Sequence, residues 1–497
     1  WHQHKYHNHL HWLSLTLAFF VISYAVIGAW WISVDEIGMT SVELAILAHA
    51  QTNVCRVKDY GAKGDGVTKD TQAIQAAIDD CSSKGGGNVL FENGKTYVSG
   101  TIFIKSNVRL KLNGASIKSA DKFSDFKKPR HKIWKAFIIC EYARDAGIEG
   151  PGNIYRNFVY MTEEEKKNYY VKGYSHEHGL EYTGVLFWHS SNVWAKNIRI
   201  ESKETMGFHL VTTESDHVEF VNVTIRAGLD AWGTDGIDIQ NSQYVKVDNV
   251  DVVSNDDSIP IATPKESPCK HITVTNSVVS SPRRRSPGNG AAGLKFGGGA
   301  AADFENVVFD NITIHNSPKG LVWGLIGTDC QAHSGCQLKN VTYSNIVIKE
   351  DVERPFYGIF EWRNHGWNLE VDADNIVFNN ITVKRNQSTS DMLSRIENMR
   401  NVVFENITYV YSGGKSPRKP LIRFRNIDGL CINNFKIIKD GKEIADPYSY
   451  LDWSASSHVT TGKPCGSPPP SSCSDSDSGK NYTQKGTCSD SASHTDL

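Results

Sequence analysis

The chain has 497 residues, of which 39% are apolar, so it is long enough to bury a substantial core. It contains 41 glycines and only 5 methionines, a composition that favours strands and turns over a helical bundle. The 53 basic residues nearly balance the 55 acidic residues, for a net charge of −2. This balance excludes the broad electrostatic attraction on which nucleic-acid binding depends, so no nucleic-acid partner is expected.

The first 50 residues have the character of a leader. Residues 13–34 are almost all apolar, and this stretch is long enough to span a bilayer. The Ala-His-Ala sequence at 48–50 has the small-x-small spacing of a signal-peptidase site. We expect residues 1–50 to be a signal peptide or a signal anchor with an incomplete N-terminus. Either interpretation carries the rest of the chain across a membrane, so an extracellular protein is expected, with membrane anchoring as the alternative.

A short helix is predicted over residues 70–81 (DTQAIQAAIDDC). Asp70 is a candidate N-cap, apolar residues follow it at helical spacing, and the turn-rich segment YGAKGDG at 60–66 precedes it. We expect this helix to cap the open end of a stack of strands, because an uncovered strand edge invites pairing with other chains.

The ten cysteines include no Cys-x-x-Cys motif and no Cys/His cluster, so a zinc site is not expected. Several disulfides in an oxidising compartment fit this pattern better. Two pairings are predicted: Cys55 with Cys81, which flank the first helix, and Cys330 with Cys336, which bracket a short loop.

The most informative pattern is a nine-residue module of alternating apolar positions with Asn in its sixth place. Its copies are NVWAKNIRI at 192, HVEFVNVTI at 217, YVKVDNVDV at 244, HITVTNSVV at 271, NVVFDNITI at 306, NVTYSNIVI at 340, NIVFNNITV at 375, NVVFENITY at 401 and a weaker GLCINNFKI at 429. The sixth-place Asn residues recur at intervals of 25 to 35 residues, which indicates a repeat protein.

Each module reads as two short strands with inward apolar faces and a bend at the Asn. Stacked coils of this kind form an all-β fold, a single-stranded right-handed parallel β-helix (solenoid), in which equivalent Asn side chains can form a hydrogen-bonded ladder.

The predicted ladder bears on N-glycosylation, because several sequons use the ladder residues. The side chains of these residues are expected to point inward and to be poor acceptors: Asn222, Asn311, Asn380 and Asn406. Asn386 and Asn481 are the favoured acceptors, and Asn340 stays open.

Three aspartates stand one coil apart. WGTDGIDIQ contains Asp235, and SNDDSIPIA, 21 to 22 residues later, contains Asp256 and Asp257. This separation is close to one turn of the β-helix, so we expect the three carboxylates to meet in a groove on one face. Glycoside cleavage needs a carboxylic acid to protonate the leaving oxygen and a carboxylate to activate water or attack carbon. Singly, each Asp would be a surface turn residue; their joint spacing favours chemistry.

With these residues the chain resembles the polygalacturonase family, family 28 of the glycoside hydrolases in the pectin lyase-like β-helix superfamily. The resemblance covers about residues 52–455 and begins at VKDYGAKGDGVTKDTQAIQAAIDDC; GTDGID matches the family's NTDGID, and NDDSIPI matches its GDDCIAI. It implies that Asp256 is the general acid and that Asp235 and Asp257 activate water in an inverting hydrolysis. Inversion implies carboxyl groups about 6.5–9.5 Å apart.

Two family motifs are altered. Ala292, in GAAGLKFGG, stands where the family has a His, and Val322 and Gly324, in KGLVWGL, replace an Arg and a Lys that bind the uronate carboxylate. Plain homogalacturonan thereby loses its expected cationic clamp. Rhamnogalacturonan hydrolases of the family also lack that His, so a branched pectin backbone or a neutral glycan is an alternative substrate.

Further groove candidates lie on the later coils. Lys295 is expected beside the lost His position, where it would partly restore positive charge, although an outward strand lysine is an equal alternative. Trp323 and Glu361 are predicted to contact substrate. Aromatic residues near Glu361 belong to the same prediction because aromatic faces stack on sugars, although packing explains each as well: Trp362, His365 and Trp367.

The composition changes again after residue 455, to Ser, Pro, Gly and Asp with scarcely any apolar residues, so residues 456–497 are predicted to be a disordered tail. The expected organisation is a leader at 1–50, one β-helix hydrolase domain at 51–455 and this tail.

The sequence thus predicts a secreted, monomeric, metal-independent glycosidase, without cofactor, acting on a pectin-type cell-wall polysaccharide. A lyase is less favoured, because related lyases use Ca²⁺ and a basic residue to abstract a proton, and no such arrangement is found. A non-catalytic carbohydrate-binding β-helix is the alternative from another class; three crowded carboxylates argue against it.

Overall fold

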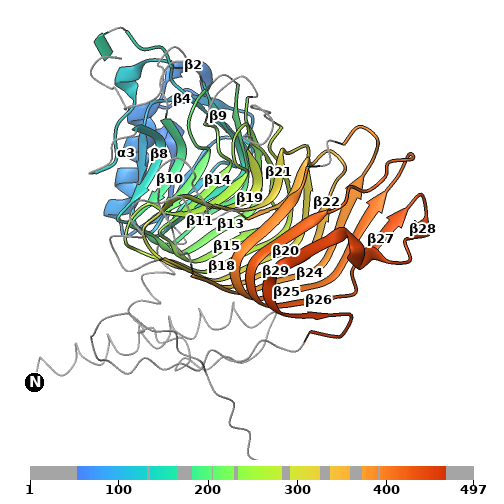
Figure 1. The fold of residues 1–497 in the computed structure, drawn as a ribbon. Helices are drawn as coiled ribbons and strands as arrows, with labels where there is room; N and C mark the ends of the chain where they lie inside the picture. Colours follow the sequence, from blue (N-terminus) through green and yellow to red (C-terminus); the bar gives the residue numbers. More distant parts are fainter. Residues whose placement is uncertain are drawn as a thin grey trace, which may run out of the picture. The chain divides into compact units, whose positions relative to one another are not determined.

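The protein is described by a computed structural model over residues 53–130, 135–157, 159–162, 164–165, 182–203, 205–228, 233–282, 291–324, 336–358, 372–389 and 392–465. These residues form one 29-stranded sheet that winds through successive coils. Strand partners lie in neighbouring coils and are parallel, apart from the antiparallel pair β27 and β28. The predicted right-handed parallel β-helix is confirmed, and Figure 1 shows its coils stacked from the N-terminal to the C-terminal strands.

The site is carried by a stack of short strands, one from each coil, which we call the site stack. Its members are β8 (Lys135–Glu141), β10 (Tyr182–Trp188), β12 (Leu210–Thr213), β14 (Ile237–Gln240), β17 (Ile259–Thr263), β19 (Ala292–Ala300), β21 (Lys319–Gly324) and β23 (Arg354–Gly358).

The remaining walls consist mostly of longer, bent strands, nearly all of which contain the nine-residue modules. The strand β9 (Arg144–Arg156) lies in the same stack but contains no copy of the module, and the module at 244 is divided between β15 (Gln243–Asp248) and β16 (Asp251–Val253). The other module strands are β11 (Ser191–Ser202), β13 (Asp216–Arg226), β18 (Cys269–Ser280), β20 (Phe304–His315), β22 (Gln337–Ile348), β24 (Asp372–Arg385), β25 (Ser394–Tyr411) and β26 (Ile422–Asn433).

The two ends are closed by short elements. The N-terminal coils contain β1 (Val54–Arg56), β2 (Asp65–Lys69), β3 (Gly87–Leu90), β4 (Thr96–Ser99), β5 (Ile102–Ile104), β6 (Val108–Lys111) and β7 (Ser116–Ser119) with 3₁₀ turns at Val57–Tyr60 and Phe123–Asp125. The C-terminal coils end in β27 (Lys436–Lys439), β28 (Lys442–Glu443), a 3₁₀ turn at Pro447–Tyr450 and β29 (Leu451–Thr461).

The alternating module sequence fixes the interior. In the register of the long strands, Val193 pairs with Val218, which pairs with Val245, so like side chains stack from coil to coil. Deeper in the chain the same stacking joins aromatic rings: Phe309, Tyr343 and Phe378 have centroids 4.9 and 5.3 Å apart. Burial of these repeated apolar columns is the main stabilising contribution to a solenoid, since each coil covers its neighbours.

The Asn ladder is present, but its direction differs from the prediction. All nine sixth-place Asn residues have φ between 49° and 57°, the left-handed conformation that Asn tolerates at a sharp bend. Their amides bridge coils; for example, Asn222 Nδ2 donates to Asn197 Oδ1 at 2.8 Å, and Asn311 Nδ2 to Asn276 Oδ1 at 2.8 Å. Eight of the nine are exposed and Asn406 is half-buried, so the expected inward orientation is wrong: the strands on either side supply the interior contacts.

The predicted capping helix is α3 (Thr71–Ser83), which packs against the first strands through Ile74, Ala77 and Ile78 (Figure 1). Asp70 is its N-cap residue, but its carboxylate makes no cap hydrogen bond; it accepts from the backbone N–H groups of Lys63 and Gly64 at 2.7 and 3.0 Å. It therefore fixes the preceding turn against the helix.

Of the predicted disulfides, Cys55–Cys81 is formed and ties α3 to β1. Cys336 is disulfide-bonded, and Cys330 lies outside the described residues. A further bond, Cys431–Cys465, was not predicted.

The β-helix continues past the predicted boundary at residue 455, because β29 pairs with β26 as far as Thr461. The chain divides into two units, 1–465 and 466–497, and the second lies wholly outside the described residues, as does the predicted leader at 1–50. None of the helices in the described ranges has both the length and the apolar character needed to cross a bilayer.

Candidate active site

The acidic cluster, Asp235, Asp256 and Asp257, forms where two neighbouring coils enter the site stack. Asp235 precedes β14 and Asp257 precedes β17, and the N–H of Gly236 donates to the carbonyl of Asp257 at 3.0 Å. The coil spacing of 21 to 22 residues therefore brings the two segments together, as the sequence predicted. One oxygen from each of the three carboxyl groups lies within 4.8 Å of the others.

Backbone N–H groups hold two of these carboxylates in place. Asp235 Oδ1 accepts from the N–H of Asp257 at 3.1 Å, and Asp257 Oδ1 accepts from the N–H of Ala292 at 2.9 Å. Ala292 is the residue that the sequence analysis placed at the family's His position. Its backbone, rather than a side chain, now contacts the cluster.

Lys295 reaches the cluster from β19. Its Nζ lies 2.5 Å from Asp257 Oδ2, and both side chains are largely buried. The attraction of Asp257 raises the pKa of Lys295, so its ammonium stays charged. This is the positive charge that the sequence suggested at this position.

Crowding acts strongly on the carboxyl groups. Burial raises the pKa of Asp235 well above its ordinary value, and the charges of Asp238, Asp256 and Asp257 act in the same direction, opposed by Lys295. A carboxyl group with a raised pKa beside other carboxyl groups is the kind of arrangement that acid/base hydrolysis uses.

Three carboxylates this close are also the type of ligand that a divalent cation prefers. Within the described ranges this is the one such group of acidic, His or Cys side chains. Lys295 already supplies a positive charge to this acidic cluster, next to Asp257.

A fourth acidic residue, Asp238, belongs to the site and was not singled out from the sequence. It alternates with the buried Ile237 and Ile239 on β14 and so faces the side of the strand opposite the core. Only 4% of Asp238 is exposed, and its Oδ2 has no hydrogen-bond partner among the residues that the structure describes. Burial and the charge of Asp257 raise its pKa well above the ordinary value. The alternation in DGIDIQ was the signal that could have found it.

His209 supports the cluster from the preceding coil. It is fully buried, its Nδ1 lies 2.8 Å from the carbonyl oxygen of Asp235, and its Nε2 lies 2.9 Å from Ser202 Oγ. Burial lowers its pKa to about 3, so the imidazole is neutral. A neutral ring satisfies both contacts if Nδ1–H donates to the carbonyl and Nε2 accepts from the hydroxyl.

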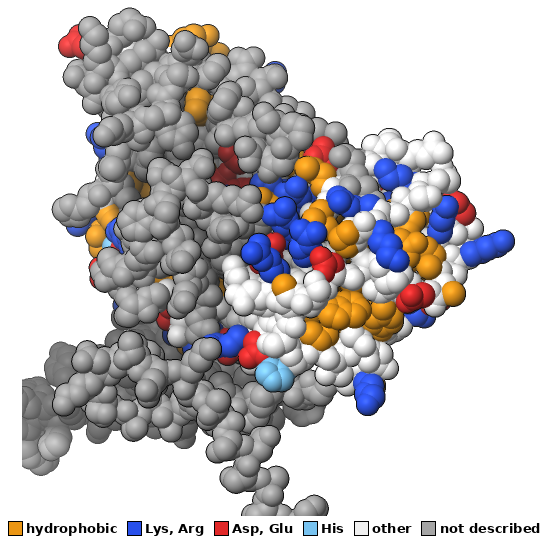
Figure 2. Space-filling view, viewed as in Figure 1, with side chains coloured by type: hydrophobic (Ala, Val, Ile, Leu, Met, Phe, Trp, Pro, Cys, Tyr) orange, Lys and Arg blue, Asp and Glu red, His pale blue; other side chains and the backbone are white. Residues whose placement is uncertain are grey.

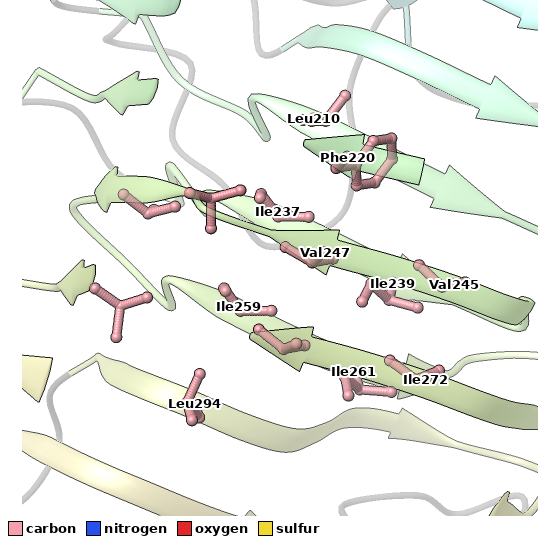
Figure 3. Close-up of a cluster of buried hydrophobic side chains, with 14 of the residues drawn as sticks. Leu210, Phe220, Ile237, Ile239, Val245, Val247, Ile259, Ile261, Ile272 and Leu294 are labelled. Atoms are coloured by element: carbon pink, nitrogen blue, oxygen red, sulfur yellow. The ribbon is translucent and has the colours of Figure 1, made fainter. Parts of the chain in front are cut away.

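The opposite faces of the site strands fill the core beneath the cluster. Leu210, Ile237, Ile259 and Leu294 point into the interior from four successive strands of the site stack, toward Phe220 and Val247 of the module strands (Figure 3). This packing fixes the strands that carry the carboxylates.

The prediction for Trp323 is wrong. Its side chain is fully buried and packs edge-on against Tyr343 and Phe378, at centroid distances of 5.4 and 5.2 Å. Strand alternation turns Trp323 inward, and the neighbouring Val322 lies in register with Lys295. The other candidates lie outside the described residues: Glu361, Trp362, His365 and Trp367.

Comparison with known proteins agrees with this geometry. The profile of Glycosyl hydrolases family 28 matches residues 89–430. Polygalacturonase-2 of Solanum lycopersicum is 24% identical over 423 residues, covering 82% of this chain and 80% of the relative. Probable rhamnogalacturonase A of Aspergillus oryzae is 25% identical over 345 residues, covering 69% and 63%.

Solved structures show the same fold. An exopolygalacturonase from Thermotoga maritima aligns with a TM-score of 0.57 at 18% identity, covering 81% of this chain and 96% of that one. An endo-xylogalacturonan hydrolase from Aspergillus tubingensis aligns with a TM-score of 0.53 at 16% identity, covering 81% and 100%. With the profile match over most of its length, the chain belongs to family 28 of the glycosyl hydrolases and is a glycosidase.

Proposed function

We propose that this glycosidase hydrolyses a pectin-type cell-wall polysaccharide outside the cell. The observation that carries the proposal is the convergence of Asp235, Asp256 and Asp257 within 4.8 Å in a chain of this family. The names of its relatives, polygalacturonase and rhamnogalacturonase, support the substrate class. Extracellular action rests on the leader predicted at residues 1–50.

In the proposed mechanism Asp256 is the general acid and donates its proton to the glycosidic oxygen as the bond to the anomeric carbon breaks. A water held by Asp235 and Asp257 attacks that carbon from the opposite face and gives up a proton to one of these carboxylates. Asp235 can accept a proton only in its ionised form, and the burial and neighbouring carboxylates that raise its pKa also make that carboxylate more basic, which favours proton acceptance at a pH above the raised pKa.

The spacing of the carboxyl groups differs from the expectation for inversion. The nearest oxygens lie within 4.8 Å, whereas separations of about 6.5–9.5 Å are general for inverting enzymes. Two oxygens 4.8 Å apart still leave room for one water hydrogen-bonded to both, at about 2.7 Å from each. Inversion therefore rests on the resemblance of GTDGID and NDDSIPI to the family motifs.

Stereochemistry is decided by following the first-formed anomer with proton NMR during cleavage. The proposal expects the anomer opposite in configuration to the bond cleaved. Appearance of the same configuration first would instead indicate a covalent intermediate on one Asp, and would remove the inverting mechanism.

The activity itself is tested by assaying reducing ends released from homogalacturonan, rhamnogalacturonan and dextran. Asp256→Asn is expected to lower the rate on the cleaved pectin on the order of 10²–10⁴-fold, because general acid catalysis is lost. The matched control, Asp446→Asn, changes an exposed Asp near the end of the β-helix and should leave the rate unchanged. If wild type releases nothing from either pectin, the substrate class is wrong.

Rhamnogalacturonan is the second candidate substrate, favoured by one feature of the site. By the family resemblance Ala292 stands where polygalacturonases have a His, which rhamnogalacturonan hydrolases also lack, and its contact with Asp257 is a backbone N–H. The same assay separates the two pectins by their relative rates.

A further inference from the structure

Two cations follow the acidic cluster along the site stack. Ala292, whose N–H binds Asp257, pairs in register with Lys319 of β21, and Lys319 pairs with Arg354 of β23. Strands in a sheet lie about 4.8 Å apart. Lys319 and Arg354, the cation pair, therefore stand two and three coils beyond Asp257 in the same row.

The cation pair shares one aromatic ring. Lys319 Nζ lies 5.0 Å and the Arg354 guanidinium 4.3 Å from the ring centre of Tyr357, and all three side chains are half-buried. Tyr357 pairs in register with Val322, which pairs with Lys295, so these three residues form a second row three residues further along the strands. A cation above an aromatic face is attracted to it, but a ring carries no net charge to neutralise two cations.

Neither member of the cation pair forms an ion pair with a carboxylate among the described residues. Arg354 Nε is buried without a hydrogen-bond partner, and Arg354 Nη2 makes a long contact of 3.9 Å with Met392 Sδ. Other cations of this protein are matched, as Lys295 is by Asp257 and Arg423 by Asp452 at 3.0 Å. Half-buried cations without a directly paired carboxylate cost free energy, because their lost hydration is only partly compensated.

The surroundings of Lys319 disfavour the charged form of its side chain. Burial lowers its pKa to about 8, and Lys295 and Arg354 act with burial while Asp257 opposes it. Burial also lowers the pKa of Arg354. A bound anion would remove this penalty, and a planar guanidinium beside an ammonium suits a carboxylate.

The surface around the later coils is also rich in positively charged side chains. Lys and Arg side chains gather on the face that the C-terminal coils present in Figure 2, with fewer acidic side chains between them, although the whole chain carries a net charge of −2. An acidic polymer is attracted to such a face, and a neutral glycan is not.

We propose that Lys319 and Arg354 form a carboxylate-binding subsite, which takes over the role of the Arg and Lys that the family resemblance expects at Val322 and Gly324. The substrate is accordingly an acidic polysaccharide with a uronic acid unit seated beside Tyr357, not a neutral glycan. This inference rests on the proposed function for its substrate backbone. The row of the cation pair lies three residues before the row of Val322 along the strands.

Binding is measured first, so that the outcome does not depend on catalysis. In an Asp256→Asn background, calorimetry compares an oligogalacturonide with the same oligosaccharide after reduction of its carboxyl groups to alcohols. The preference for the acid over the reduced form is expected to fall on the order of 10- to 100-fold in Lys319→Met and in Arg354→Met. Lys319→Arg should retain most of the preference, because it keeps the charge.

Lys246→Met is the matched control, since Lys246 is exposed on β15, outside the site stack, and the acid preference should stay as in the parent. Melting curves check that each variant is folded. An unchanged preference in both Met variants, or no binding of the acid by the parent, overturns the subsite. If the acid binds through the cation pair but wild type cleaves no pectin, the subsite stands and the proposed hydrolysis fails.

Discussion

At the scale of single residues, Asp238 is held in a costly environment. Its Oδ2 is buried without a partner, and its Oδ1 has a long contact of 3.5 Å with Gln240 Nε2. Burial and the neighbouring Asp257 raise its pKa well above the ordinary value, with Lys295 acting in opposition. Functional sites commonly retain residues that destabilise the folded state. We therefore expect Asp238 to lower the free energy of unfolding at neutral pH.

Asp238→Asn is therefore predicted to stabilise the protein at pH 7. The folded state keeps the proton of Asp238 to a higher pH than the unfolded chain does, so this group lowers stability as pH rises above the unfolded pKa of about 3.9. The Asn variant lacks this loss, and its Tm should exceed that of wild type by about 1–3 °C at pH 7.

Thermal unfolding from pH 3 to pH 8 checks the sign. Near pH 3 the carboxyl group is protonated in both states, so the difference between variant and wild type should vanish. Asp446→Asn, which changes an exposed carboxyl group, should follow wild type at every pH. A lower Tm of Asp238→Asn at pH 7 would mean that Asp238 is ionised and stabilised by Lys295.

At the scale of strands, the sequence predicted correctly the features that depend on alternation within one strand. It did not predict the features that depend on how strands of neighbouring coils pair in register. The two Asp motifs lie one uninterrupted coil apart, so their meeting could be foreseen. Residues 321–323 are all apolar, so alternation of polar and apolar residues does not show which of their side chains face the core. Only the pairing of Val322 with Lys295 and of Trp323 with Phe296 shows that Val322 points outward and Trp323 inward.

Register also explains why the cation pair was missed. Module intervals vary from 25 to 35 residues, because insertions of different length separate the coils. Sequence distance therefore does not tell which residue of a later coil stands in line with Asp257. Lys319 and Arg354 have no motif of their own, and their shared row emerges only from strand pairing.

The Asn ladder gives a prediction about glycosylation. A ladder Asn uses its Nδ2, the atom to which a glycan is attached, to donate to the preceding coil, and Asn340 likewise donates to Asn306 Oδ1 at 3.0 Å. In Asn386 the Oδ1 accepts from Ser388 Oγ at 2.7 Å, within its own sequon, and the residue lies outside the ladder. Asn386 is expected to be the modified site within the described residues.

Peptide mapping of protein from a secretory host, deglycosylated in ¹⁸O-water, reads each Asn directly. Label should appear at Asn386 and disappear in Ser388→Ala. The ladder sequons should remain unlabelled: Asn222, Asn311, Asn340, Asn380 and Asn406. Substantial label at Asn311 would show that the ladder forms too late, or too weakly, to protect its amides.

At the scale of the whole molecule, a solenoid must close both ends. The helix over residues 70–81 was foreseen as the N-terminal cap, because apolar spacing identifies it. The C-terminal end was placed too early, at 455, since β29 is polar and mostly exposed. β29 pairs with β26, and no strand of the described residues covers its other edge, so a polar composition is what an edge strand requires.

This end predicts a sharp difference between two truncations. A chain ending at residue 465 keeps β29 and the Cys431–Cys465 bond and should melt like the full chain. A chain ending at 455 loses the second half of β29 and a cross-link whose loop, with a sequence separation of 34, is worth about 3–4 kcal/mol in chain entropy. Its Tm should fall by several degrees, and its uncovered β26 edge should promote association, visible by light scattering.

Cys465→Ser in the chain ending at 465 separates the loss of the disulfide from the loss of β29: it should reproduce the fall in Tm without the association. Equal melting of both truncations would place the structural end of the β-helix before β29.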